Sequence, residues 1–315
     1  MKKAIVAGST GFIGSAIVRA LLRENIDVLA LGRRPWKDIN PERMTKAEIL
    51  TYLQIDTSKI RSLPNQVKKI GWKPGSSCVF YYFSWSGVNR LTDGTISDQL
   101  KNVTYSTNAV LAANELGCTK FVNVGSQEET FTQKYLKLDW GKKDYHSEQG
   151  IYAVSKLTAR DMCKIIAYLH KINFVHTRIS VFVDENLSAV GYVPSVLKNI
   201  LNGKSYDSPQ NTQLFDLFPL EDAAKAYVLI GKYGKNKADY FIGSGEPRPL
   251  DHYFTQFKSI VNDESYLDVN NRLLTQQSFD ADSFSINDLV NDTGMIINGT
   301  FDDFAKKVVN KWKKQ

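Results

Sequence analysis

A glycine-rich segment near the N-terminus constrains the fold of this chain more than any other feature. It follows an apolar run over residues 4–7 and opens an amphipathic segment over residues 12–22. The segment reads Gly8-Ser9-Thr10-Gly11-Phe12-Ile13-Gly14. A strand, a glycine turn and a helix in this order let the backbone approach a pyrophosphate at the helix N-terminus. We therefore expect a dinucleotide-binding site here rather than an ordinary glycine turn.

Further apolar runs recur along the first part of the chain. They cover residues 28–31, 52–55, 79–83, 121–124 and 174–179. Helical patterns separate several of them, and the long ones cover residues 95–116 and 152–170. The runs are too continuous for strands with one solvent-exposed face, but they suit a parallel sheet that helices cover on both sides. This alternation of apolar runs and helical patterns predicts an α/β fold with a doubly wound, parallel Rossmann-type sheet.

The composition narrows the function classes. The formal charge of +7 is spread along the chain except for the tail at residues 311–314, so we expect a solvated face and no nucleic-acid partner. Because no apolar window approaches the length of a membrane span, we expect no membrane partner and a cytoplasmic location. Cys78, Cys118 and Cys163 are odd in number and far apart, which predicts reduced, buried thiols and no metal site.

Three residues form a candidate catalytic set. Tyr152 and Lys156 are four apart in a helical pattern, so the ammonium can lie near the phenol and lower its pKa toward working pH. Ser126 follows the apolar run that ends at residue 124, where a hydroxyl can donate to a ligand at the carboxyl edge of a sheet. Taken singly, Ser126 could cap a turn, Tyr152 could be a surface aromatic, and Lys156 could be solvated.

Two arginines indicate the cofactor. Arg33 and Arg34 follow the second apolar run, where a carboxylate would otherwise accept the ribose 2′-hydroxyl of NAD. A guanidinium pairs well with a phosphate, so the sequence favours the 2′-phosphate of NADP, with NAD possible. The alternative interpretation is a solvated basic turn.

The glycine segment, Ser126 and the Tyr152–Lys156 pair together resemble the extended branch of the short-chain dehydrogenase/reductase superfamily, whose members mostly modify nucleotide-linked sugars. The resemblance implies that Ser126 orients the sugar C4 oxygen and that Tyr152 transfers the proton. It also implies that Lys156 lowers the phenol pKa and holds the nicotinamide ribose.

The same resemblance adds further cofactor contacts. Asp56 matches a position near the adenine, Ser84 and Trp85 match the turn beneath the nicotinamide ribose, and Asn102 matches a polar position on the following helix. From the residues alone, Asp56 could instead be an N-cap and Asn102 a satisfied core amide. The complete set of expected cofactor-binding residues is Gly8, Thr10, Gly11, Phe12, Ile13, Gly14, Arg33, Arg34, Asp56, Ser84, Trp85, Asn102, Tyr152 and Lys156.

The second part of the chain has shorter segments punctuated by glycine and proline, as expected for a smaller substrate lobe. Residues 213–224 resemble the segment where the family returns to its first domain. We therefore expect an interleaved arrangement. The dinucleotide-binding domain should comprise residues 1–180 and 213–234, and the α/β substrate-binding lobe residues 181–212 and 235–315.

Two departures from the family pattern bear on the reaction. The related 4,6-dehydratases place an acidic pair after the hydroxyl residue, but Gln127 stands here, and an amide cannot protonate a leaving hydroxyl. Glu128 or Glu129 could still be a base. Phe215 replaces an arginine that pairs with phosphate in many 4-epimerases, so Lys198, Lys204 or Arg248 would have to hold a diphosphate.

These features favour an NADPH-dependent reductase of a nucleotide-activated 4-keto-6-deoxyhexose, acting at C4, as in O-antigen or capsule sugar pathways. A nucleotide-sugar 4-epimerase with a retained cofactor is the close alternative. A non-catalytic dinucleotide sensor or RNA-binding relative is a third possibility, although a sensor has no need of a proton donor. The expected partners are a nucleotide-diphospho-sugar and a second copy of the chain in a homodimer, the latter by resemblance only.

Overall fold

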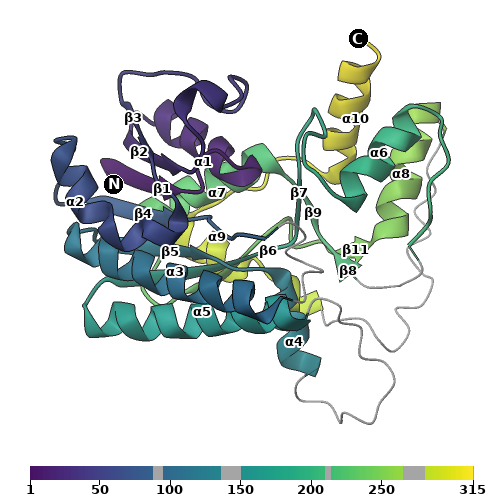
Figure 1. Ribbon diagram of the computed structural model, residues 1–315. Coiled ribbons are helices and arrows are strands. Elements are labelled where there is room, and N and C mark those ends of the chain that lie inside the picture. Colours follow the sequence, from purple (N-terminus) through teal and green to yellow (C-terminus); the bar gives the residue numbers. More distant parts are fainter. Residues whose placement is uncertain (88–94, 136–149, 210–213, 265–280, 315) are drawn as a thin grey trace.

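A seven-stranded parallel sheet forms the centre of the protein (Figure 1). The computed structural model describes residues 1–87, 95–135, 150–209, 214–264 and 281–314. The strands lie in the order β10-β6-β5-β4-β1-β2-β3. Their bounds are β1 Lys3–Ala7, β2 Asp27–Gly32, β3 Leu50–Gln54, β4 Cys78–Tyr82, β5 Lys120–Val124, β6 Asn173–Ile179 and β10 Asp239–Ile242. Each apolar run predicted to be a strand is one, so the doubly wound fold is confirmed.

Helices cover both faces of this sheet (Figure 1). Along β1, Ala4 and Val6 pack in one core, and Ile5 and Ala7 pack in the other, because successive side chains of a strand point to opposite faces. The first core contains α1 (Phe12–Arg23) and α7 (Leu220–Tyr233). The second contains α2 (Leu63–Lys69), α3 (Ile96–Glu115) and α5 (Gly150–Leu169). The strand order reverses between β1 and β4, which is where this fold opens a crevice for ligands.

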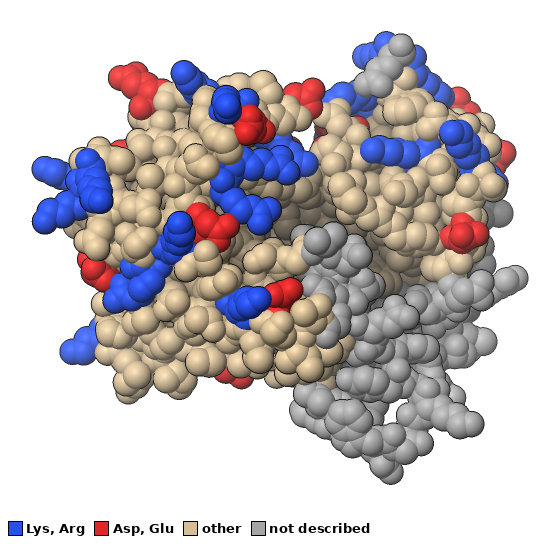
Figure 2. Space-filling model, in the orientation of Figure 1, with Lys and Arg blue, Asp and Glu red and all other residues tan. Residues whose placement is uncertain are grey.

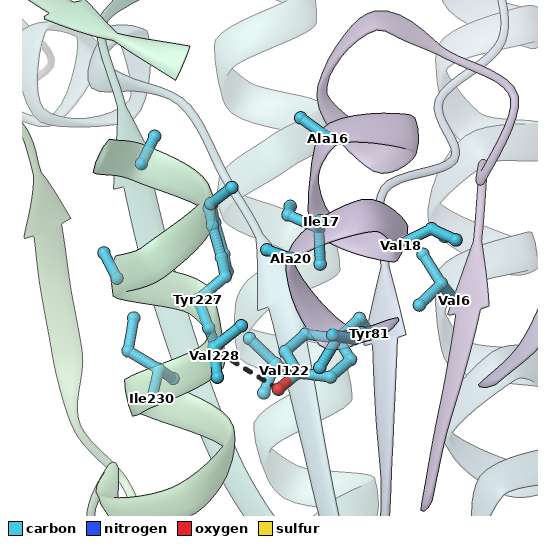
Figure 3. Packing of buried hydrophobic residues seen from close by; sticks show 14 of the residues in the cluster. Val6, Ala16, Ile17, Val18, Ala20, Tyr81, Val122, Tyr227, Val228 and Ile230 are labelled. Atoms are coloured by element: carbon cyan, nitrogen blue, oxygen red, sulfur yellow. Dashed lines mark hydrogen bonds between the residues drawn. The ribbon is translucent and has the colours of Figure 1, made fainter. Parts of the chain in front are cut away.

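Figure 3 shows how α1 and α7 pack on the first face. Ile17 and Ala20 of α1 lie beside Tyr227 and Val228 of α7, and all four side chains are buried. The hydroxyl of Tyr81, from β4, donates to the Tyr227 carbonyl at 3.1 Å, which satisfies a polar group that would otherwise be costly to bury. This packing attaches the helix that follows the glycine segment firmly to the sheet.

A smaller lobe contains α6 (Tyr192–Leu201), α8 (Leu250–Asn262) and α10 (Phe301–Trp312) (Figure 1). Phe254, Phe257 and Phe304 are in its core. A capping box between Thr300 and Asp303 begins α10, as the sequence indicated. Two short sheets accompany these helices: β7 (Val181–Val183) pairs with β9 (Leu217–Pro219), and β8 (Leu214–Phe215) pairs with β11 (Arg248–Pro249). The remaining elements are α4 (Gln127–Tyr135), α9 (Asn287–Thr293) and 3-10 helices at Trp36–Asp38, Thr57–Ser62 and Ala281–Phe284.

One predicted boundary needs correction. The sequence-based division ended the dinucleotide-binding domain at residue 234, but β10 pairs in parallel with β6 as the seventh strand of the central sheet. Leu289 of α9 also packs in the core that contains α1 and α7. The first domain therefore takes up further segments after residue 234, and the chain crosses between the lobes more often than expected.

The three cysteines are free and buried, as predicted. Across the described ranges, no helix is long and apolar enough to cross a bilayer, and no group of three or more His, Cys, Asp or Glu residues could hold a metal ion. The cytoplasmic location stays a prediction.

Candidate active site

The glycine segment forms a tight turn between β1 and α1. Gly8 has a φ of +79°, and a Cβ there would lie 2.9 Å from the carbonyl carbon of Phe83, so only glycine fits. The N–H groups of Gly8 and Ser9 both donate to the Leu31 carbonyl at 3.1 Å, which joins the turn to β2. Among the described residues, no side chain caps the N-terminus of α1, and the first turn of this helix carries no acidic residue. This helix end therefore suits an anion such as a pyrophosphate.

Arg33 and Arg34 lie at the carboxyl end of β2 with exposed side chains. Two side chains of β3 fix their backbone, because Gln54 donates to the Arg33 carbonyl and Tyr52 donates to the Arg34 carbonyl. Figure 2 shows Lys and Arg side chains gathered beside the hollow between the two lobes. The arginines are thus presented on a rigid backbone with their guanidinium groups accessible.

Asp56 lies close to this basic turn and caps the 3-10 helix that follows β3. Its Oδ1 accepts hydrogen bonds from the N–H and hydroxyl groups of Ser58 at 2.9 and 2.7 Å. These bonds hold the pKa of Asp56 below its ordinary value, and the charge of Arg33 lowers it further. The N-cap interpretation of Asp56 is therefore confirmed, and its role near an adenine stays a prediction.

Arg43 is a basic residue that the sequence did not single out. Its Nη1 lies 3.4 Å from the Thr10 carbonyl, and its own carbonyl accepts a hydrogen bond from Arg19 at 2.9 Å. A further guanidinium thus lies against the glycine segment. Arg43 is remote in sequence from Arg33 and Arg34, in a segment without regular secondary structure, so no motif indicated it.

Tyr152 and Lys156 are both buried on α5, with 6% and 7% of their surface exposed. The Lys156 ammonium donates to the Val124 carbonyl at 3.0 Å and lies 3.9 Å from the centre of the Trp85 indole. The rings of Trp85 and Tyr152 pack edge to face, with their centroids 5.9 Å apart and their planes at 82° to each other. The burial excludes a surface tyrosine and a solvated lysine. The structure therefore brings Tyr152, Lys156 and Trp85 together at the carboxyl end of the sheet.

Residues of α3 hold the turn that carries Trp85. The indole N–H donates to Gln99 Oε1 at 2.9 Å, and the amide of Asn102 exchanges hydrogen bonds with the backbone and hydroxyl of Ser86. Asn102 is thus a satisfied core amide, the alternative that the sequence left open. Gln99 Nε2 is buried and has no partner among the described residues. Ser84 precedes Trp85, and a Cβ at Gly8 would lie 3.0 Å from the backbone nitrogen of Ser84.

Ser126 lies at the end of β5 and caps α4. Its Oγ accepts from the Glu128 N–H at 3.3 Å, while its own N–H donates to Glu129 Oε1 at 2.7 Å. The capping interpretation of Ser126 is therefore confirmed, but it does not exclude a second role. A serine hydroxyl that accepts one bond still carries a proton to donate, so Ser126 can cap the helix and orient a ligand oxygen.

The two residues after Ser126 differ in character. Burial raises the pKa of Glu128 to about 7, which makes its carboxyl group an acid or base near neutral pH. Gln127 is buried, its Nε2 lies 3.4 Å from the Ser283 carbonyl, and its Oε1 has no partner in the described part of the chain. An amide with an unpaired acceptor suits a ligand donor, but it supplies no proton for a leaving group.

A cavity of about 660 Å³ lies between the lobes, where Figure 2 shows the surface hollowed. Phe12 and Arg43 line it from the first lobe, and Arg248 and Phe301 line it from the second. Residues of α1 and α7 also line it, whereas Ser126, Tyr152 and Lys156 do not. The cavity and the candidate catalytic residues are therefore separate features of the structure.

Arg248 stands directly opposite Phe215 in the antiparallel β8–β11 pair. Side chains of directly opposed residues lie near each other. A guanidinium therefore lies close to the position where the sequence lacks the expected arginine, with Gln256 Oε1 and Glu246 Oε2 at 3.4 and 3.5 Å. Lys198 and Lys204 belong to the exposed surface at the C-terminal end of α6.

Comparisons with known proteins agree with this geometry. Residues 4–243 match the model of the NAD dependent epimerase/dehydratase family. A CDP-abequose synthase from Salmonella muenchen is 24% identical over 268 residues, which are 84% of this chain and 82% of that protein.

Two solved structures share the fold over nearly their whole length. A UDP-glucose 4-epimerase from Thermotoga maritima, with UDP-glucose, has a TM-score of 0.73 and 13% identity, and the match covers 99% of both chains. A dTDP-glucose 4,6-dehydratase from Bacillus anthracis, with NAD, has a TM-score of 0.74 and 16% identity, and the match covers 100% of this chain and 97% of that one.

Proposed function

Because this chain belongs to the NAD dependent epimerase/dehydratase family, we propose that it reduces a nucleotide-activated 4-keto-6-deoxyhexose at C4 with NADPH. The family makes the chain an enzyme that works with a nicotinamide dinucleotide. The observation that carries the finer proposal is the enclosed pair of Tyr152 and Lys156 beside Trp85. The Lys156 ammonium lies 5.8 Å from the centre of the Tyr152 ring, so its charge would act on the phenol as a proton donor to a carbonyl oxygen under reduction.

The residues around the glycine turn fit the cofactor. The uncapped end of α1 would hold the pyrophosphate, and Arg33 and Arg34 would hold the 2′-phosphate of NADP. Lys156 would bind the nicotinamide ribose on the wall formed by Trp85. The bound cofactor supplies the hydride.

The chain's own residues supply the proton and the orientation. Ser126 would donate a hydrogen bond from its hydroxyl to the C4 oxygen and so fix the carbonyl beside Tyr152. Tyr152 would then transfer its phenolic proton to that oxygen as the C4 centre is reduced. Lys156 would lower the pKa of the phenol through its charge, because a nearby cation favours the phenolate.

Arg248 is our candidate for the diphosphate of the substrate. It stands opposite Phe215, so its charge would take the place of the missing arginine. The CDP-linked product in the name of the Salmonella relative makes cytidine the first nucleotide to test. Gln127 argues against expulsion of a C6 hydroxyl, because its amide has no proton to give to a leaving group.

One experiment tests the reaction type. The purified protein is incubated with CDP-, dTDP-, UDP- and GDP-linked 4-keto-6-deoxyglucose and with the parent nucleotide hexoses, with and without NADPH. The reduced-nicotinamide absorbance and the masses and configurations of the products are followed. We expect one NADPH oxidised per sugar reduced, and no turnover without added cofactor. Interconversion of unreduced nucleotide hexoses without added cofactor would replace the reductase by the 4-epimerase.

A further inference from the structure

A buried chain of polar side chains leads from the middle of the sheet to the backbone of Ser126. Asn123 of β5 and His176 of β6 are register partners, and their side-chain nitrogens lie 3.1 Å apart. His176 Nε2 then lies 2.9 Å from Glu129 Oε2, and Glu129 Oε1 accepts from the Ser126 N–H at 2.7 Å. Glu129, His176 and Asn123 are only 0%, 2% and 3% exposed.

Which of Asn123, His176 and Glu129 donates each hydrogen bond follows from the donors present. An amide nitrogen only donates, so the Asn123 amide donates to Nδ1 of His176, and the ring proton lies on Nε2, facing Glu129. Both carboxylate oxygens of Glu129 are thus engaged, one by the ring and one by the Ser126 N–H. The charge of Arg160 also acts on Glu129. The carboxylate is therefore fixed in one rotamer without an unpaired buried charge.

Gly125 gives independent evidence that Glu129 and His176 fix the backbone next to Ser126. A Cβ at Gly125 would collide with Glu129 Oε1 and with Cε1 and Nε2 of His176. The pair therefore packs directly against the peptide that carries Ser126. An ordinary capping box needs only one oxygen of its glutamate, so the second contact, across to β6, ties the helix start to the sheet.

We propose that Glu129 and His176 are positioning residues for Ser126, an inference that rests on the proposed function. They touch neither substrate nor cofactor. They set the backbone at Ser126 so that its hydroxyl meets the C4 oxygen beside Tyr152. Because that hydrogen bond matters most in the transition state, loss of the pair lowers kcat more than it changes KM or cofactor affinity.

The test compares Glu129→Leu, Glu129→Gln and His176→Leu with Thr132→Val, which removes another buried polar group from α4. The measurements are kcat and KM with CDP-4-keto-6-deoxyglucose, NADPH affinity, the melting temperature, and the amide proton shift of Ser126 in ¹⁵N-serine-labelled protein, assigned with Ser126→Ala. The Ser126 N–H donates to a charged carboxylate, which strengthens that hydrogen bond. We therefore expect kcat to fall about 10- to 100-fold in Glu129→Leu and the Ser126 amide proton resonance to move upfield.

Glu129→Gln keeps an acceptor for the Ser126 N–H but turns an amide N–H toward the Nε2 proton of His176, so it should regain only part of the lost kcat. Thr132→Val should lose melting temperature without losing kcat. Unchanged kcat in a folded Glu129→Leu protein, or an equal loss of NADPH affinity, would overturn the positioning role. If wild type reduces none of the sugars, the proposed function fails. The Ser126 amide shift then decides this inference alone: an unaltered shift in both Glu129 variants and His176→Leu refutes it. If Glu129→Leu does not fold, His176→Leu decides: an unchanged kcat together with an unaltered Ser126 amide shift in that variant would overturn the positioning role.

Discussion

The ammonium of Lys156 lies 3.9 Å from the centre of the Trp85 indole, close enough for a cation–π interaction in a water-poor site. Trp85 in turn is held by Gln99. The indole therefore sets where the Lys156 charge can act on the phenol of Tyr152.

Replacing Trp85 should change catalysis through Lys156. A buried cation–π contact is worth about 0.5–2 kcal/mol, so Trp85→Ala should lower kcat by about 2- to 30-fold and shift the kcat–pH profile to higher pH. Trp85→Phe keeps an aromatic face and should lose less. Equal kinetics and pH profiles for wild type and Trp85→Ala would show that the indole does not position the lysine.

Tyr152→Phe should abolish most turnover while NADPH binding stays nearly intact, because the ring still packs against Trp85 but the proton is gone. General acid catalysis typically supplies about 10²–10⁴-fold, which sets the expected loss of kcat. Steady-state kinetics and a fluorescence titration with NADPH measure the two effects. A variant that retains most of its activity would remove Tyr152 as the proton donor.

Arg33→Asp should reverse the cofactor preference, because a carboxylate repels a 2′-phosphate and accepts a ribose 2′-hydroxyl. A charge-assisted hydrogen bond contributes about 1.5–3 kcal/mol, so we expect at least about tenfold preference for NADPH over NADH in wild type. Lys73→Asp, the same charge change at another exposed loop position, is the control. Equal affinities of wild type for both cofactors would make the arginines an ordinary basic turn.

Glu128 should make stability depend on pH. Burial raises the pKa of Glu128 in the folded protein to about 7 from an ordinary 4.5. The neutral carboxyl group therefore adds to the free energy of unfolding below the unfolded-state pKa, and this contribution is lost as pH rises through the folded-state pKa. Glu128→Gln should therefore gain melting temperature relative to wild type between about pH 5 and pH 8. Glu48→Gln, at an exposed position, should show no such trend. A difference between Glu128→Gln and wild type that is constant over this range would contradict the assignment.

An apolar stripe on α5 supports the expected homodimer. Exposed side chains recur there at helical spacing: Ile151, Val154, Met162, Ile165 and Leu169. We expect a dimer by light scattering in wild type and a monomer in Ile165→Glu, because a buried unpaired charge opposes association. Lys164→Glu, a neighbouring exposed position off the stripe, should leave the dimer intact. A monomeric wild type would show that the stripe is not a dimer interface.

The sequence predicted the parts of the fold that carry strong periodic signals. Each of the first six strands overlaps an apolar run of the sequence, and the glycine turn has a fixed place between β1 and α1. By contrast, β10 is four residues long and begins with an exposed aspartate, so no run marked it as a strand.

The candidate site likewise has residues that the sequence predicted and residues that it did not. Ser126, Tyr152 and Lys156 were visible from residue type and spacing. The Ser126–Glu129 spacing carried the signature of a capping box, so that partner could have been found. His176 could not, because its contact with Glu129 depends on the register of β5 with β6, which no local pattern encodes.

The position of β10 has a consequence for how the protein is made. The nascent chain builds six neighbouring strands and then leaves the sheet to form part of the smaller lobe, before it returns with the strand that pairs with β6. The edge of β6 therefore stays open until the ribosome has passed residue 242, and a fragment ending at residue 234 would expose an unpaired strand edge. Such edges associate with other chains, so we expect that fragment to aggregate rather than to fold as a separate domain.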